Sequence, residues 1–174
     1  DTISKQFKNG MMGEGVLGYD EVNMSQSIKV LTTGSRNVTA NVATAVASEG
    51  ATTIALSGLG ATNTIAAGDV FTVSGVYTVN PQTRESTGSL QQFVVTSAVT
   101  ADGTGAATVT VSPAMYTPAH ALATVSALPG AASGNVTFIG AASTQYAQNM
   151  VYHKDAITFA TADLLLPPNL QFAS

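Results

Sequence analysis

The sequence predicts an all-β protein, mainly antiparallel, arranged as a β-barrel or a β-sandwich. Threonine and valine, which favour strands, are abundant throughout the chain. Short runs of these residues are separated by Gly, Asn, Asp and Pro, which favour turns. Almost no segment has the apolar period of an amphipathic helix. Many short strands without a repeat of fixed period are typical of barrels and sandwiches.

The first 25 residues predict a short helix followed by an extended strand. The helix would run from Ser4, as its N-cap, to Met12, with Asn9-Gly10 weakening its end. Rough alternation of apolar and polar residues predicts the strand over Gly13–Ser25. Because the first residue, Asp1, is not Met, we expect a cut or processed chain.

The densest β region begins at Asn37. Residues 37–59 predict two short strands around a turn at Glu49-Gly50. Residues 70–79 predict either a compact hairpin or one bulged strand, interrupted at Ser74-Gly75. Alternation places Val70 and Thr72 on one face of this segment, and Phe71 and Val73 on the other.

The middle of the chain predicts an antiparallel strand pair. A polar loop over Gln82–Gly88 precedes the longest strand candidate, Leu90–Val99. The turn signal Ala101–Gly105 then leads into Ala107–Val111, and we expect Ser112-Pro113 to end that strand by removing a hydrogen-bond donor.

The last third of the chain predicts a loop and a closing strand. Residues 116–134 are rich in Ala, Pro and Ser and predict a loop or a covering segment. Asn135–Gly140 predicts a strand that could close the barrel. The apolar Leu164-Leu165-Leu166, near the end, is expected to need a partner.

Composition excludes several classes of function. Only 9 % of residues are charged, against about a quarter in a typical soluble domain, which suits a surface that meets other protein. A net charge of −4 with six scattered basic residues predicts no direct nucleic-acid site. The absence of cysteine excludes disulfides, thiolate metal sites and cysteine nucleophiles. No apolar run reaches the roughly 18 residues of a membrane span, so no membrane partner is expected.

An ordered set of motifs resembles the podovirus-type coat proteins of tailed bacteriophages. The motifs extend over most of the chain, from about residue 13 to about residue 168. They are Gly18-Tyr19-Asp20, Gly68-Asp69-Val70-Phe71-Thr72-Val73, Val79-Asn80-Pro81-Gln82-Thr83-Arg84, Ser86-Thr87-Gly88, Leu90-Gln91-Gln92-Phe93-Val94-Val95, Val111-Ser112-Pro113 and Gln148-Asn149-Met150-Val151-Tyr152-His153-Lys154-Asp155-Ala156.

The resemblance implies the shell fold of tailed-phage and herpesvirus capsids, carrying an inserted β-barrel. We expect a shell-core segment over 1–35, the inserted barrel over 36–142 and return strands over 143–174. From the resemblance, we expect the family's preceding N-terminal arm and long spine helix, and its final strands, to have no counterpart in this sequence.

In function, the resemblance implies a major capsid protein and not an enzyme, with no catalytic, cofactor or metal residues. Its implied partners are copies of the same protein, with scaffolding, portal or decoration proteins as further candidates. Its implied location is the virion, after assembly in the bacterial host cytoplasm.

Few residues are candidates for chemistry. His153-Lys154-Asp155 could be part of an acid–base site or a metal ligand pair, but a polar kink between strands is the favoured interpretation. His120 lacks a second ligand at metal spacing and is expected to be a loop residue. Asp69 and Asp102 stand beside glycine and predict Asx turns, and Asp20-Glu21 predicts an exposed acidic pair.

The polar loop over 82–88 is the candidate contact site. Arg84 and Glu85 at its tip could form inter-subunit salt bridges that set register, or could simply be solvated.

Two other classes of function stay open. A phage tail, baseplate or decoration module would bind a structural partner without tiling a lattice. A carbohydrate-binding β-sandwich would need a patch of exposed aromatic side chains, for which the candidates are Tyr77, Tyr116, Tyr146 and Tyr152.

Overall fold

The structure is a computed structural model that describes residues 26–153, 155–156 and 158–160. The helix expected over 4–12, the strand expected over 13–25 and the apolar segment at 164–166 lie outside the described residues. The acidic pair Asp20-Glu21 lies outside them too.

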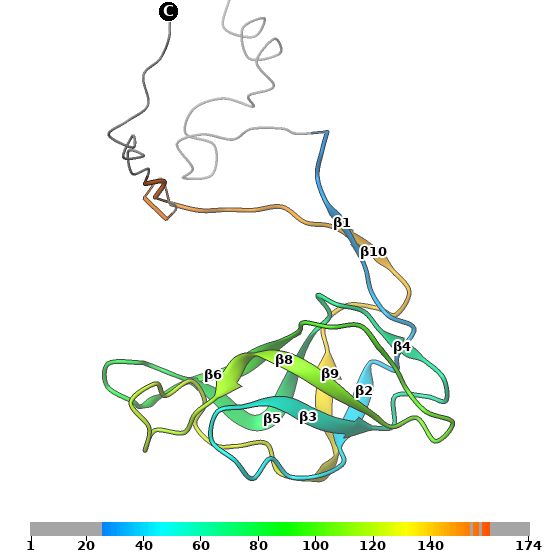
Figure 1. The fold of residues 1–174 in the computed structure, drawn as a ribbon, viewed down its shortest axis with the longest axis horizontal. Helices are drawn as coiled ribbons and strands as arrows, with labels where there is room; N and C mark the ends of the chain where they lie inside the picture. Colours follow the sequence, from blue (N-terminus) through cyan, green and yellow to red (C-terminus); the bar gives the residue numbers. More distant parts are fainter. Residues whose placement is uncertain (1–25, 154, 157, 161–174) are drawn as a thin grey trace, which may run out of the picture.

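A closed antiparallel barrel forms the body of the described chain (Figure 1), confirming the all-β prediction and deciding for the barrel over the sandwich. In order around the barrel, its strands are β2 (Thr39–Val42), β3 (Ala51–Ser57), β8 (Ala107–Met115), β6 (Ser86–Val95), β5 (Val70–Val79) and β9 (Ala132–Phe138). The expected strand near residue 135 does close the barrel, because β9 pairs with both β2 and β5.

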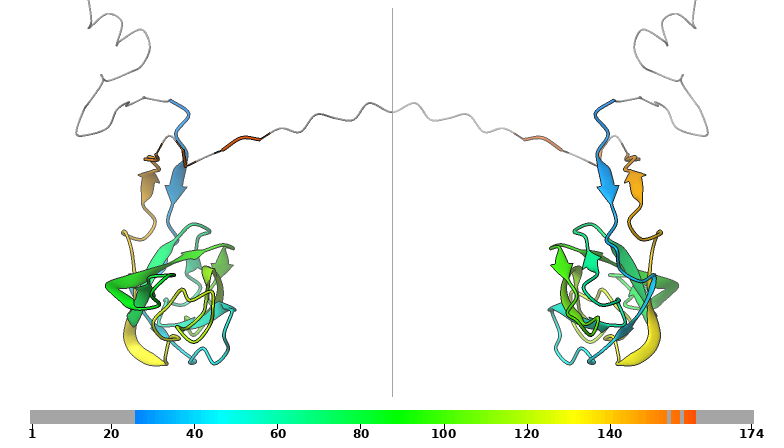
Figure 2. Two further views of the ribbon diagram at one scale, coloured as in Figure 1. Left: turned by 90° about the vertical axis from the view of Figure 1, so that its left-hand side faces the viewer. Right: turned by 90° about the vertical axis from the view of Figure 1, so that its right-hand side faces the viewer.

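Two small two-stranded sheets lie outside the barrel. β4 (Thr64–Ile65) pairs with β7 (Val99–Thr100), and β1 (Val30–Thr32) pairs with β10 (Gln145–Ala147). The β1–β10 pair, here called the ribbon, leaves one end of the barrel and carries the chain away from it (Figure 2). An isolated two-stranded ribbon is marginally stable in water, so its anchoring to the barrel is important.

Three phenylalanines occupy the barrel interior. Phe71 is the cross-strand partner of both Phe93 on β6 and Phe138 on β9. Its ring centroid lies 5.7 Å from that of Phe93 and 5.2 Å from that of Phe138, both in tilted arrangements. Aromatic pairs favour such separations, and the three rings fill the middle of the core.

β5 is one bulged strand, and the alternative of a hairpin at Ser74-Gly75 is wrong. Phe71 and Val73 are buried as alternation predicts. The register with β6 then shifts between Thr72 and Tyr77, and Gly75 adopts a φ of 83°, which glycine accepts without a steric penalty. The shift turns Val76 back into the core.

β8 continues past Pro113 to Met115, so the expectation that Ser112-Pro113 ends the strand is wrong. The register of β3 against β8 is irregular between Ala51 and Thr53, and this irregularity lies opposite the proline. A bulge requires no ladder donor at each position, so the missing N–H of proline is tolerated there.

β6 is displaced toward the N-terminus from its expected position. It runs over Ser86–Val95 instead of Leu90–Val99, and part of the expected polar loop is therefore strand. The cause is the length of β5, since Val79 pairs with Ser86. The antiparallel pairing of β6 with β8 is confirmed by the partners Val95 and Val111.

The segment between β8 and β9 covers one part of the barrel, as predicted. Val125 is buried within it and bridges to Thr78 of β5, and Ala123 is buried beside it. β9 begins at Ala132 and ends at Phe138, earlier at both ends than the expected Asn135–Gly140, because Val42 of β2 pairs with Ala132.

Candidate functional site

The base of the ribbon contains a buried ion pair. Arg36 and Asp69 both have side chains that are 0 % exposed, and the Arg36 Nη2 to Asp69 Oδ1 distance is 3.4 Å. Arg36 follows β1, whereas Asp69 immediately precedes β5, so the pair joins the ribbon's entering chain to the barrel wall. Charged side chains are almost never fully buried unless they are paired.

Each partner makes further contacts. Arg36 Nη2 also donates to the Ile139 carbonyl at 3.3 Å, and its guanidinium carbon lies 4.4 Å from the ring centroid of Phe138. Asp69 Oδ2 accepts the amides of Gly34 at 3.1 Å and Ala66 at 2.9 Å. Burial lowers the pKa of Arg36, and the nearby Asp69 and Tyr146 act in the opposite direction.

The Asx-turn prediction is right for Asp102 and wrong for Asp69. Asp102 Oδ1 accepts the amides of Thr104 at 2.8 Å and Ala106 at 2.9 Å, and these bonds lower the pKa of Asp102. Asp69 instead accepts amides that precede it in the chain. An aspartate beside a glycine does not by itself distinguish the two cases, because the partner Arg36 is distant in sequence.

Arg84 and Glu85 lie at the tip of the β5–β6 turn, which projects from the barrel on the side away from β4 (Figure 1). The Arg84 amide donates to the Asn80 carbonyl at 2.8 Å, and the Asn80 amide donates to the Glu85 carbonyl at 3.0 Å. Arg84 has a φ of 60°. The turn is therefore well hydrogen-bonded, and both charged residues are exposed.

In the described residues, the two histidines contact different neighbours. His153 Nδ1 lies 3.4 Å from Asp155 Oδ2, with both side chains 73 % exposed, and Lys154 lies outside the described residues. His120 stacks on Tyr116 at 4.4 Å between ring centroids. Within the described part of the chain, no group of three or more His, Cys, Asp or Glu could hold a metal ion.

A second loop contact lies beside this stacked pair. Glu49 accepts hydrogen bonds from the Thr117 amide at 2.8 Å and from the Thr117 hydroxyl at 2.6 Å. These bonds, with a smaller contribution from His120, lower the pKa of Glu49. The contact ties the β2–β3 connection to the segment that follows β8.

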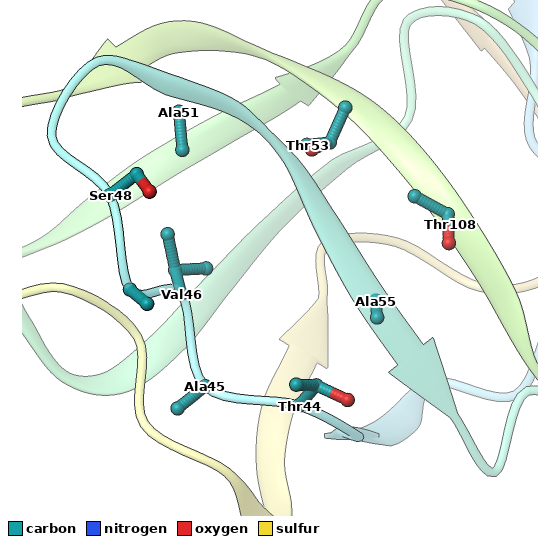
Figure 3. A pocket seen from close by; sticks show the side chains of 9 residues that line it. Thr44, Ala45, Val46, Ser48, Ala51, Thr53, Ala55 and Thr108 are labelled. Carbon is teal, nitrogen blue, oxygen red and sulfur yellow. The ribbon is translucent and has the colours of Figure 1, made fainter.

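One open pocket of about 330 Å³ lies between the 44–48 segment and β3 (Figure 3). Its lining consists of small side chains without an aromatic ring or a charge: Thr44, Ala45, Val46, Ala47, Ser48, Ala51, Thr53, Ala55 and Thr108. Small-molecule sites usually combine apolar and aromatic walls with convergent polar groups, which this lining lacks.

The four candidate tyrosines are divided between two parts of the molecule. Tyr77 and Tyr116 belong to the barrel, where their carbonyls accept amides of the 124–126 segment. Tyr146 lies on β10, where its hydroxyl accepts the Ala141 amide at 2.9 Å, and Tyr152 follows on the same strand's continuation. The tyrosines therefore do not form one sugar-stacking surface.

Some exposed large apolar side chains of the described residues lie on the ribbon or on the chain next to it, and others lie on the barrel. Those on or next to the ribbon are Ile28, Val30, Tyr146, Met150, Val151, Tyr152 and Phe159. Within the ribbon, Val30 pairs with Ala147 and Leu31 with Tyr146, so Val30 and Tyr146 lie on opposite faces. No helix in the described residues is long and apolar enough to cross a membrane.

Comparison with known proteins identifies the family. No curated protein matches this chain. The model of the family described as "P22 coat protein - gene protein 5" matches residues 1–174, which is the whole sequence. This match shows that the chain belongs to the P22 coat protein family and is a tailed-phage coat protein.

Proposed function

We propose that this protein builds an icosahedral phage shell through lateral contacts between copies, and that it has no catalytic activity. The observation that carries the proposal is the exposed apolar surface of the ribbon and of the chain that follows β10, which includes Val30, Met150 and Tyr152. Such a surface is stabilised by covering it with protein, and a charged fraction of 9 % suits a chain surrounded by neighbours.

We further propose the division of the chain into a shell-core segment over 1–35, an inserted barrel over 36–142 and return strands over 143–174. The barrel strands lie between Thr39 and Phe138, and the ribbon strands lie outside these limits. The ribbon would carry the chain between the barrel and the shell core. Scaffolding, portal or decoration proteins are further partners under this proposal, and assembly takes place in the host cytoplasm.

Arg84 and Glu85 are the proposed polar contacts between subunits. The turn that holds them is hydrogen-bonded at both ends, so little conformational freedom is lost when a neighbour binds. In the described chain neither residue forms an ion pair within its own subunit. Charges at the rim of an interface steer association and set register more than they add affinity.

Assembly can be tested by sedimentation velocity and electron microscopy. The purified 174-residue chain is compared with the same chain joined to the sequence that flanks it in its gene. Closed shells of uniform size from the longer protein support the proposal. Small discrete oligomers from both proteins contradict it and favour a tail, baseplate or decoration module.

The contact residues are tested separately in the shell-forming protein. Charge reversal in R84E or E85R is expected to slow assembly and to change its salt dependence, because exposed charge pairs are screened by salt. The double variant R84E/E85R restores assembly if Arg84 of one copy pairs with Glu85 of another copy, because both members of the pair are then reversed together. Unchanged assembly in both single variants contradicts the assignment of this turn.

A further inference from the structure

We propose that the Arg36–Asp69 pair is an orientation clamp, which holds the β1–β10 ribbon in a single direction relative to the barrel. The proposal concerns the described chain itself and does not depend on shell formation. It is argued from where the pair's partners lie, from how the ribbon is otherwise attached, and from the energetics of a buried ion pair.

The clamp's partners come from every segment that meets at the base of the ribbon. Arg36 and Gly34 lie on the chain that enters the barrel from β1. Ile139, whose carbonyl accepts from Arg36, lies on the chain that leaves β9 toward β10. Asp69 opens β5 and binds the Gly34 amide as well as Arg36. The chain that enters the barrel, the chain that leaves it and the start of the barrel strand β5 are therefore joined through the side chains of Arg36 and Asp69.

Three hydrogen bonds near this point join the two ribbon chains to each other. The Thr33 amide donates to the Thr144 carbonyl at 3.0 Å, and the Thr33 hydroxyl donates to the Ala141 carbonyl at 2.7 Å. The Ser143 amide donates to the Gly34 carbonyl at 3.0 Å. These bonds keep the ribbon paired, but they do not set its angle to the barrel.

Attachment to the barrel side includes a close approach at Gly34, hydrogen bonds between Ser35 and Thr64, a bond from the Ile139 amide to the Val70 carbonyl at 2.8 Å, and the clamp. A β-carbon at Gly34 would collide with the Thr64 carbonyl oxygen and the Ile65 Cα, so the entering chain lies directly against β4. The Arg36 amide donates to the same Thr64 carbonyl at 3.2 Å. The backbone contact brings the chains together, and the ion pair fixes the direction from which they arrive.

A buried ion pair is better suited to specifying a geometry than to raising stability. Desolvation of two charges offsets much of their attraction, and an apolar replacement of similar size is often no less stable. In the described chain, the Nε and Nη1 atoms of Arg36 are buried without a hydrogen-bond partner, which adds a further cost. The pair contributes a fixed geometry, because the contacts of Arg36 to Asp69 and to the Ile139 carbonyl are directional.

Distance measurement between spin labels tests the clamp on the full 174-residue chain. The sequence contains no cysteine, so labels attach only where cysteines are introduced. Thr108 on β8 and Gln145 on β10 are exposed and suit the substitutions T108C and Q145C. Pulsed electron paramagnetic resonance then reports the distribution of distances between barrel and ribbon.

The clamp predicts one narrow distribution in the parent protein. R36M and D69N are each expected to broaden it at least twofold while the barrel still unfolds cooperatively by circular dichroism. D102N is the matched control, because Asp102 also accepts two backbone amides but is exposed and has no arginine partner. The distribution of D102N should equal that of the parent.

Two results would overturn the proposal. One is a parent distribution as broad as that of R36M, and the other is an R36M distribution as narrow as the parent's. If D69N and R36M fail to fold, R36Q provides the test, because its neutral side chain is shorter and cannot form the ion pair with Asp69. An R36Q distribution equal to the parent's overturns the clamp, and a broadened one supports it.

Discussion

Substituting Phe71 with alanine tests whether the three-ring core determines the stability of this coat protein's barrel. Phe71 is 0 % exposed and lies between the rings of Phe93 and Phe138. Removing a buried phenylalanine side chain typically costs about 3–5 kcal/mol. The upper half of that range is expected here, because two aromatic pairs are lost and each contributes about 0.5–1.5 kcal/mol beyond area burial.

The magnitude is large relative to the stability of a typical domain, which is about 5–15 kcal/mol. Urea denaturation followed by far-ultraviolet circular dichroism measures the free energy of unfolding of F71A and of the parent. F159A is the matched control, since Phe159 is 89 % exposed and its loss should change stability by less than about 0.5 kcal/mol.

The same logic predicts an intermediate effect for F71L. Leucine retains much of the buried apolar area but removes both aromatic pairs, so the loss should fall between those of F159A and F71A. A loss below about 1 kcal/mol in F71A, well under the usual range for this change, would refute the reasoning. So would an equal loss in F159A, because the effect would then not depend on burial.

Three further predictions follow from other contacts. The lowered pKa values of Glu49 and Asp102 mean that their carboxylates stabilise the fold above their ordinary values of 4.5 and 3.8. This stabilisation is lost as pH falls through the lowered values, so thermal melting between pH 5 and about pH 2 should decline less steeply in E49Q and D102N than in the parent. G34A should lower the free energy of unfolding, measured by urea denaturation, by about 2 kcal/mol or more, because the added β-carbon collides with the backbone of β4. G103A is the control and should have little effect on the urea midpoint, because the space around Gly103 is open. R84E should leave the melting temperature within about 2 °C of the parent's, since an exposed turn charge contributes little to stability, and a larger change would contradict its assignment as a solvent-exposed contact residue.

Local sequence patterns predicted which side chains face the core where one face of a strand is buried. Alternation in residues 70–73 placed Phe71 and Val73 on the core side, and the structure confirms it. These patterns did not predict where a strand begins when both of its faces are exposed. This is the case in the first half of β6, whose residues are all exposed from Ser86 to Leu90. There the position of the strand depends on its partner, Val79 of β5.

Predictions made from a single residue show the same limit, as Pro113 and Asp69 illustrate. Pro113 was expected to end a strand, but the irregular register of β3 opposite it removes the need for a donor. Asp69 follows a glycine and Asp102 precedes one, and both were expected to form Asx turns, but their surroundings in space differ. Arg36 precedes β2 and β3 in the chain, and Asp69 follows them. Only the fold therefore brings the two side chains into contact.

The sequence by itself determined the class of this protein: an antiparallel β fold, few charges, no cysteine chemistry and the ordered motifs of a tailed-phage coat protein. These properties depend on composition and on short-range alternation, which the chain carries locally. Tertiary structure alone decided the closure of the barrel, the bulges that re-aim β5 and β8, and the buried pair at the base of the ribbon. Each of these depends on pairing between segments distant in sequence, and the energy of such contacts exists only once the chain has folded.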